Sequence, residues 1–278
     1  MTSAFSDEAS RLQAVFDCES PVAFVTGSTA DRVGRVVAEN LQRLGCRVVL
    51  HGRTNPSGHP VGTEQLAGRE VPKLAGNIQE EANVLAWRDW ILEQFGRIDI
   101  AVNSAACWDP KPLEATTEED WTHQLMVNAV GPAISCKAFG LAMVEQKSGG
   151  VILNVGDWAI DRPYLDFAAY MVSKGNIPTL TSTMAVELAT RNPRVRVNAV
   201  LPGPVMIDKS VSEERQERVR EDCLLKRHGT AEDVAHAISF LASSPFVTGV
   251  CLNVDGGRSI HSASGASSSC DSIAHPGV

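Results

Sequence analysis

The chain has 278 residues, of which 44% are hydrophobic and 21% charged, a length and composition that suit one domain with a large core. Acidic residues outnumber basic ones by 33 to 25, and this balance argues against nucleic acid or an anionic membrane as a partner. No secretory signal, membrane-length apolar run, CxxC pair or metal-ligand spacing of histidines is present. We therefore expect a cytoplasmic protein with reduced thiols, a small-molecule substrate and no metal.

Short apolar runs alternate with helical patterns along residues 21–258. The first twenty residues predict an amphipathic helix outside the fold proper, the Pro/Gly-rich stretch 55–62 predicts a loop, and the Ser-rich residues 259–278 predict a disordered tail. The predicted strands are Val22–Gly27, Cys46–Arg53, Val71–Gly76, Ile98–Ala106, Gly149–Asp157, Val195–Gly203 and Gly249–Gly257. The predicted helices are Arg35–Leu44, Glu80–Phe95, Glu118–Gln146, Ala168–Thr190, Ser212–Arg227 and Ala231–Ala242.

Strands joined by helices require right-handed crossovers and a sheet that is covered on both faces. We therefore predict a single α/β domain with a Rossmann-type, doubly wound sheet of about seven parallel strands. Ligands of such sheets bind beyond the carboxyl ends of the strands, so the functional residues are expected there.

The turn after the first strand suits the phosphates of a dinucleotide. Gly27 allows a tight turn, Gly34 lets the next helix approach the sheet, and the helix N-terminus at Val33 attracts an anion. The turn lacks a middle glycine and carries Arg32, whose guanidinium suits a phosphate. An ordinary strand-to-helix loop is the alternative interpretation.

The second strand ends without the carboxylate that commonly holds the ribose hydroxyls of NAD. It offers His51, Arg53 and Thr54, which favour a 2′-phosphate and therefore NADPH over NADH. The alternative is that Arg53 is a solvated surface charge.

Tyr170 and Lys174 stand four residues apart on a predicted helix, so their side chains share a face. A neighbouring ammonium and an oxidised nicotinamide would both lower the phenol pKa from its ordinary value of about 10. Tyr170 would then be a usable general acid for reduction, although such a pair also arises by chance on many helices.

In chain order, the motifs between Val22 and Gly257 closely resemble the short-chain dehydrogenase/reductase family. These motifs are the glycine turn, Asn103-Ser104-Ala105-Ala106, Asn128, Tyr170-Met171-Val172-Ser173-Lys174, Pro202-Gly203 and Asp255-Gly256-Gly257. The resemblance implies that Lys174 also holds the nicotinamide ribose and that Asn128 supports a water-mediated proton relay. It further implies a homotetramer and cofactor contacts by Asn77, Ile78, Asn103, Ser104, Ala105, Pro202, Gly203 and Val205. Turn or capping chemistry is the alternative for the two asparagines Asn103 and Asn128.

Asp157 departs from the family pattern, because a serine that donates to the substrate carbonyl usually stands thirteen residues before the tyrosine. An ionised carboxylate cannot donate a hydrogen bond, whereas a protonated one can. The exchange resembles the pteridine reductases of the family, as do Arg32, the segment 51–54 and the aromatic Trp108. This resemblance predicts reduction of a pterin or a similar flat heterocycle. The substrate would contact Trp108, Asp157, Tyr164, Tyr170 and Met206.

Two features differ from the pteridine reductases: the glycine turn is one residue longer, and Val205 replaces a small hydroxyl residue. A carbonyl or 3-oxoacyl reductase therefore stays open as an alternative, as does a non-catalytic dinucleotide sensor. Trp108 could also belong to the core. The charge-rich segment within Ile207–Leu225 predicts a helix over the substrate cleft, which is a mobile lid in relatives.

Overall fold

The computed structural model describes residues 2–54, 61–206 and 212–261. Within these ranges, eight strands form one sheet in the order β3-β4-β2-β1-β5-β6-β7-β8. Every neighbouring pair is parallel except β3 with β4. The strands are β1 (Val22–Val25), β2 (Arg47–Gly52), β3 (Val61–Leu66), β4 (Arg69–Ala75), β5 (Ile100–Asn103), β6 (Gly150–Val155), β7 (Val195–Pro202) and β8 (Cys251–Val254).

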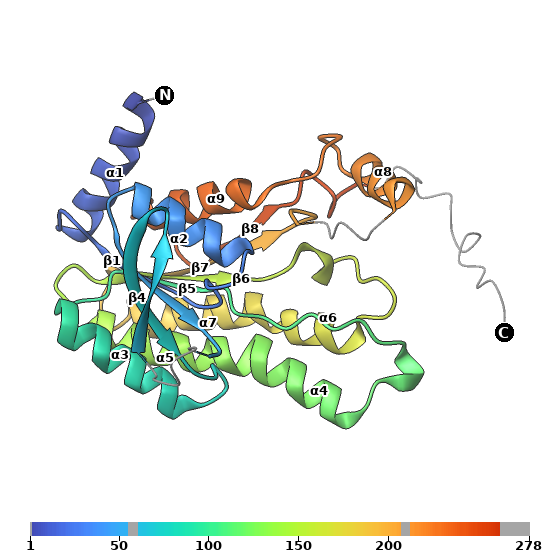
Figure 1. The fold of residues 1–278 in the computed structure, drawn as a ribbon, viewed down its shortest axis with the longest axis horizontal. Coiled ribbons are helices and arrows are strands. Elements are labelled where there is room, and N and C mark those ends of the chain that lie inside the picture. Colours follow the sequence, from blue (N-terminus) through green and yellow to red (C-terminus); the bar gives the residue numbers. More distant parts are fainter. Residues whose placement is uncertain (1, 55–60, 207–211, 262–278) are drawn as a thin grey trace.

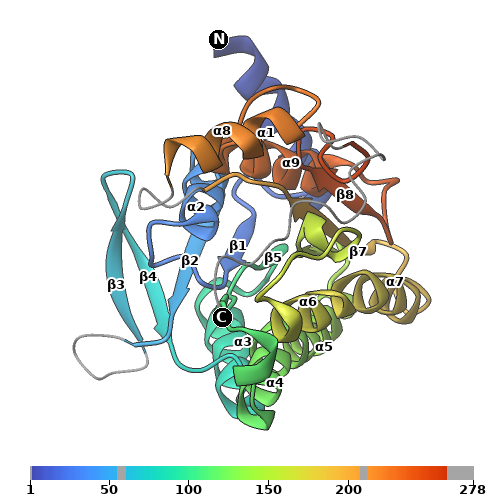
Figure 2. The same ribbon diagram turned by 90° about the vertical axis from the view of Figure 1, so that its right-hand side faces the viewer.

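Two layers of helices cover the sheet, as Figures 1 and 2 show. One face carries α1 (Thr2–Phe16), α2 (Val33–Arg43) and α9 (Ala231–Ser243), and the other carries α3 (Glu81–Phe95), α5 (Gly131–Val144) and α7 (Asn176–Ala189). Side chains alternate along β1 between the two cores, with Ala23 and Val25 in one and Val22 and Phe24 in the other. The remaining helices are η1 (Leu113–Ala115), α4 (Glu118–Leu125), η2 (Met126–Val130), η3 (Trp158–Ile160), α6 (Ala168–Lys174) and α8 (Glu213–Asp222).

The predicted doubly wound sheet is confirmed, with one added strand at its edge. Part of the predicted loop 55–62 is strand, because Val61 and Gly62 begin β3; residues 55–60 lie outside the described ranges. Ala67 and Gly68 connect β3 to β4 with φ of 45° and 79°, the positive values that a tight hairpin turn needs. The seven predicted strands are all present and parallel, and β3 adds an antiparallel strand at the edge of the sheet.

The N-terminal helix forms as predicted, but the prediction that it lies outside the fold is wrong. Leu12 and Phe16 of α1 are fully buried in the same apolar core as Val234, Ile238 and Leu241 of α9. Their large apolar side chains leave water only by packing on the domain, so α1 completes one face. The predicted disordered tail falls mostly on residues 262–278, which are outside the described ranges.

The long predicted helix is also present, as α4, η2 and α5 in succession. By length and composition alone, Glu118–Val144 could cross a membrane, but half of its apolar window is buried inside the domain. Core helices of soluble proteins pass the same test, so this helix is weak evidence for a membrane span. The predicted helix Ala168–Thr190 divides at Gly175 into α6 and α7, and Pro178 lies in the first turn of α7, where proline is tolerated.

Candidate active site

The glycine turn between β1 and α2 is held tightly against the end of β5. Gly27 has a φ of +66°, and a Cβ there would lie 2.7 Å from the Ala105 Cα. A Cβ at Gly34 would lie 2.7 Å from the Gly27 carbonyl oxygen. Thr26 Oγ1 accepts hydrogen bonds of 3.0 Å from the backbone N–H groups of both Ser104 and Ala105. The turn therefore requires glycine at both positions.

This turn presents the groups that an anion needs. Helix α2 begins at Val33, and its N-cap residue, Arg32, makes no side-chain cap, so the first N–H groups of the helix remain available to a ligand. Arg32 and Arg53 are exposed, and neither guanidinium forms an ion pair with any residue that the structure describes. No carboxylate ends β2, where Arg53 and Thr54 follow Gly52. These residues fit a dinucleotide that carries a 2′-phosphate.

His51 lies beneath the turn rather than beside a phosphate site. Its ring is buried, Nδ1 accepts from the Gly27 N–H at 3.2 Å, and Nε2 lies 3.2 Å from the Gly76 carbonyl oxygen. This geometry requires a neutral ring with its proton on Nε2. Burial is the main cause that lowers the pKa of His51 to about 4. The predicted pairing of His51 with a 2′-phosphate is therefore wrong, and His51 instead positions the turn.

The buried His51 makes the protein acid-sensitive. Its folded-state pKa of about 4 lies below the ordinary 6.5, so the unfolded chain binds more protons in this window. We expect the free energy of unfolding to fall by up to about 3 kcal/mol from this residue as the pH drops from 6.5 to 4. In urea unfolding experiments across this pH range, the free energy of unfolding of His51→Gln should depend less on pH than that of the wild type, because glutamine does not titrate. The exposed His236→Gln is the control, and equal slopes in wild type and His51→Gln would contradict the assignment.

Asn77 and Ile78, which are predicted cofactor contacts, directly follow Gly76, whose carbonyl oxygen contacts the His51 ring. Asn77 Oδ1 accepts from the Gln79 N–H at 3.2 Å, while Ile78 is buried and packs closely against Gly131. Their contact with the cofactor stays a prediction.

Tyr170 and Lys174 share one face of α6, as the spacing predicts, and both are buried. Tyr170 Oη donates a hydrogen bond of 2.6 Å to Asp157 Oδ2, and Lys174 Nζ donates one of 2.8 Å to the Val155 carbonyl. The other carboxylate oxygen, Oδ1, accepts from the Ala159 N–H at 2.8 Å and caps η3. The structure thus brings the tyrosine, the lysine and the unusual aspartate together at the end of β6.

The electrostatics of this group differ from the expected lowering of the phenol pKa. Burial and then the Asp157 carboxylate raise the pKa of Tyr170 well above 10. Burial also lowers the pKa of Lys174 to about 8, against an opposing effect of Asp157. A buried phenol that donates to a carboxylate keeps its proton, because the phenolate would place a second negative charge beside the first. Tyr170 is therefore a proton donor over the neutral range.

Asn128 lies in η2, a π-helical segment in the middle of the long helix. Its Oδ1 accepts from the Cys107 N–H at 3.0 Å, and its Nδ2 lies within 3.0 Å of acceptors on Cys107, Gln124 and Ser173. Asn128 therefore fixes the segment after β5 next to α6. Its part in a proton relay to Lys174 stays a prediction.

Asn103 is buried at the end of β5 and donates from Nδ2 to Asn154 Oδ1 at 2.8 Å. Its own Oδ1 has no hydrogen-bond partner among the described residues. Ser104 and Ala105, which follow it, are half-buried against the glycine turn. The predicted cofactor-lining segment therefore lies beside the phosphate-binding turn.

Trp108 is half-exposed, so the alternative that it belongs to the core is wrong. One face of its indole stacks on Phe167, with ring centres 4.9 Å apart and planes inclined by 21°. Phe167 also meets Tyr164 and Tyr170 edge to face. Phe167 was not predicted, and its place three residues before the tyrosine is the only signal that the sequence offers for it. These rings form an aromatic platform that leads to the Tyr170 hydroxyl.

The segment after β7 closes the other side of the site. A Cβ at Gly203 would lie 2.5 Å from the Asp255 Cα, and the Val205 N–H donates to the Gly203 carbonyl at 2.8 Å. Pro202 is buried, and Met206, the last described residue before the gap at 207–211, is half-exposed. Of the expected lid, residues 207–211 lie outside the described ranges.

Arg258 joins α8 to the loop that carries Asp157. Its guanidinium lies 3.5 Å from the Asp222 carboxylate and stacks over the Trp158 ring at 4.7 Å. Trp158 is therefore buried under Arg258 and packs behind the site.

Comparison with known proteins supports an oxidoreductase fold. The family model described as Enoyl-(Acyl carrier protein) reductase matches residues 29–259. A short chain dehydrogenase/reductase of Aspergillus oryzae is 32% identical over 256 residues, which cover 88% of this chain and 97% of the relative. The human 3-oxoacyl-acyl-carrier-protein reductase is 32% identical over 225 residues, covering 81% and 92%. A short chain dehydrogenase from Bacillus anthracis aligns with a TM-score of 0.75 and 26% identity, covering 87% and 97%.

Proposed function

Because the chain belongs to the short-chain dehydrogenase/reductase family, we propose that it is an NADPH-dependent reductase of a ketone or a 3-oxoacyl thioester. One observation carries the proposal: the buried phenol of Tyr170 donates a hydrogen bond to Asp157 at the carboxyl edge of the sheet, on the same helix as Lys174. Bound NADPH would supply the hydride to the substrate carbon. Arg32, Arg53 and the N-terminus of α2 would hold its phosphates.

Tyr170 supplies the proton in this proposal. As the carbonyl carbon gains hydride, its oxygen gains negative charge and becomes a stronger acceptor for the Tyr170 hydroxyl than Asp157 is. The hydroxyl proton then moves to that oxygen. Lys174, held on the Val155 carbonyl, stabilises the phenolate that remains. Asp157 holds the phenol in place before the substrate enters.

Reduction of a pterin is the second candidate, and Asp157 favours it. A carboxylate that contacts the phenol could order water for a ring nitrogen, and the free face of Trp108 suits a flat ring. Neither curated relative described above is named as a pteridine reductase, whereas the human relative is named for a 3-oxoacyl substrate. We therefore propose carbonyl reduction as the main activity. The homotetramer and the cytoplasmic location stay predictions from the family resemblance.

A substrate panel separates the two candidates. NADPH oxidation should be followed with a 3-oxoacyl thioester, a simple diketone and dihydrobiopterin at equal concentrations. We expect kcat/KM to be at least tenfold higher for a carbonyl substrate than for the pterin. A higher kcat/KM for the pterin than for the carbonyl substrates would favour pterin reduction as the activity. Tight NADPH binding without turnover of any substrate would favour a dinucleotide sensor.

Cofactor choice should depend on Arg53. A charge-assisted hydrogen bond to the 2′-phosphate contributes about 1.5–3 kcal/mol, so Arg53→Ala should raise the KM for NADPH about 10- to 100-fold. The KM for NADH should change little, because NADH lacks this phosphate. Arg69→Ala, an exposed arginine at the start of β4, is the matched control. An equal change for both cofactors would show that Arg53 does not read the phosphate.

A further inference from the structure

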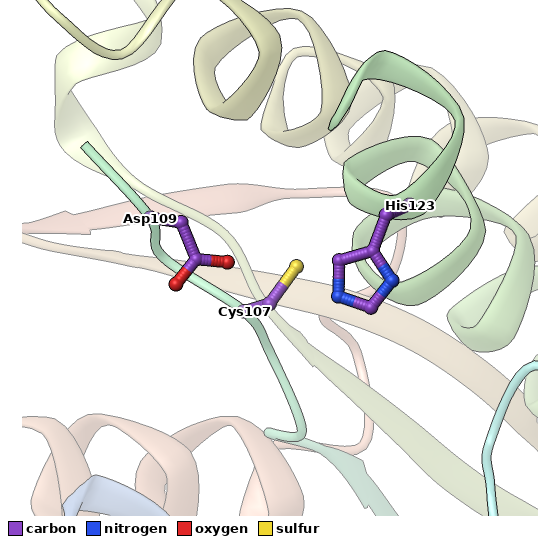
Figure 3. A group of neighbouring side chains, drawn as sticks. All are labelled: Cys107, Asp109 and His123. Atoms are coloured by element: carbon purple, nitrogen blue, oxygen red, sulfur yellow. The ribbon is translucent and has the colours of Figure 1, made fainter. Parts of the chain in front are cut away.

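Three side chains with metal-binding atoms converge at the rim of the site. Figure 3 shows Cys107 and Asp109, which follow β5, facing His123 of α4. One ligand atom from each, a sulfur, a carboxylate oxygen and a ring nitrogen, lies within 4.8 Å of the other two. The sequence predicted no metal site, because the histidine lies on another element and no ligand spacing reveals it.

The donor set suits zinc. Thiolate, imidazole and carboxylate together are typical ligands of Zn²⁺, whereas Mg²⁺ and Ca²⁺ prefer oxygen alone. Bond lengths of about 2.0–2.3 Å place neighbouring ligands of a tetrahedral zinc roughly 3.3–3.7 Å apart. Because the three atoms lie within 4.8 Å of one another, they must approach by at most about 1.5 Å. Asp109 and His123 are exposed, so rotation of their side chains can achieve this without moving the core.

A buried glutamine already links two of these ligands. Gln124 Oε1 accepts from the Cys107 thiol at 3.0 Å, and its Nε2 lies 3.5 Å from Asp109 Oδ2. Gln124 is buried and is also bonded to Asn128 at 2.9 Å, so its amide is fixed from behind. Gln124 Nε2 can therefore support the Asp109 carboxylate from outside the coordination sphere, whereas the hydrogen bond from Cys107 ends when the thiol loses its proton.

The fourth position would face a cleft. Asp109 and His123 line a small hollow of about 60 Å³, and Phe167, Ala168 and Ala169 form part of its wall. Lys111 in the same hollow is paired with Asp120, so it does not neutralise Asp109. Three protein ligands with one open position is the arrangement that leaves room for water.

We propose that Cys107, Asp109 and His123 bind one Zn²⁺ ion, with water in the fourth position, at the rim of the catalytic cleft. The Cys107 thiol releases its proton to solvent when the sulfur binds the metal. Trp108 lies between two of the ligands in the chain, so the ion would hold the segment that carries the aromatic platform.

Cobalt provides a direct test, since Co²⁺ takes the same tetrahedral sites and a thiolate ligand adds a charge-transfer absorption. The reduced, metal-free full-length chain should be titrated with Co²⁺ and then with Zn²⁺, which should displace it. We expect the wild type to bind one equivalent of Co²⁺ and to show the thiolate-to-cobalt charge-transfer absorption. Cys107→Ser should lose the band, while His123→Ala and Asp109→Asn should weaken Zn²⁺ binding at least tenfold.

Matched variants outside the cluster keep the test specific. Cys251→Ser removes another half-buried thiol, and His236→Ala removes another exposed imidazole. Both should bind like wild type, and circular dichroism should show that every variant is folded. The proposal is overturned if the thiolate band survives in Cys107→Ser, if the controls weaken binding equally, or if wild type binds no stoichiometric ion.

Discussion

Tyr170→Phe is expected to lower kcat/KM for carbonyl reduction by about 10²- to 10⁴-fold, the contribution typical of a positioned general acid. The variant removes only the hydroxyl that donates to Asp157 and leaves the buried ring in contact with Phe167. Affinity for NADPH, measured by fluorescence titration, should therefore stay within a few-fold of wild type. Loss of turnover with retained binding would place Tyr170 at the proton-transfer step.

The chain offers one matched control, because it contains only two tyrosines. Tyr164→Phe keeps the ring that meets Phe167. Among the described residues, the hydroxyl that it removes forms no hydrogen bond with Asp157. Its turnover should stay within a few-fold of wild type. If both variants lose activity equally, or Tyr170→Phe keeps it, the assignment of Tyr170 as the acid fails.

Asp157→Ser is expected to lower the pKa of Tyr170 and to move alcohol oxidation to lower pH. The carboxylate raises this pKa in two ways, by its negative charge and by accepting the phenol's hydrogen bond. Serine removes the charge, so phenolate, the base that oxidation needs, forms at lower pH while burial still acts on the ring. We expect the acidic limb of the kcat/KM profile for oxidation to shift down by roughly one pH unit or more.

The two tyrosines also make the pKa directly measurable. In a Tyr164→Phe background, the ultraviolet tyrosinate signal reports Tyr170 alone, and its titration midpoint should fall when Asp157→Ser is added. If neither the titration midpoint of Tyr170 nor the pH profile of oxidation changed in Asp157→Ser, Asp157 would not control the pKa of the Tyr170 phenol. Pterin turnover that disappears in Asp157→Ser, with carbonyl turnover kept, would instead assign Asp157 to the second candidate reaction.

The location of the site followed from the order of the motifs. Gly27, Asn103, Asp157 and Pro202 all stand at or just after predicted strands, and the carboxyl ends of parallel strands meet at one edge. The pairing of Tyr170 with Lys174 followed from helical spacing alone. The sequence pattern was sufficient to locate these residues, because their positions depend on the ends of strands and on helical spacing and not on individual tertiary contacts.

Other features depend on tertiary contacts that no local pattern records. His51 is polar and ends a strand, yet Trp87 packs 4.3 Å from its ring and the glycine turn covers it. The bond between Tyr170 and Asp157 spans thirteen residues, so only the fold sets its length. Strand β3 alternates exposed and half-buried residues at the sheet edge, where a weak pattern beside Gly and Pro resembles a loop.

The burial of α1 against α9 has a consequence for the order in which the chain folds. Leu12 and Phe16 are synthesised well before Val234, Ile238 and Leu241 of their core, which lie more than two hundred residues later in the chain. Such distant contacts form slowly, because a long loop must close before they contribute. The part of α1 that packs on α9 therefore stays uncovered until α9 has been synthesised. During that interval the nascent chain exposes a surface that chaperones bind and that other unfinished chains can stick to.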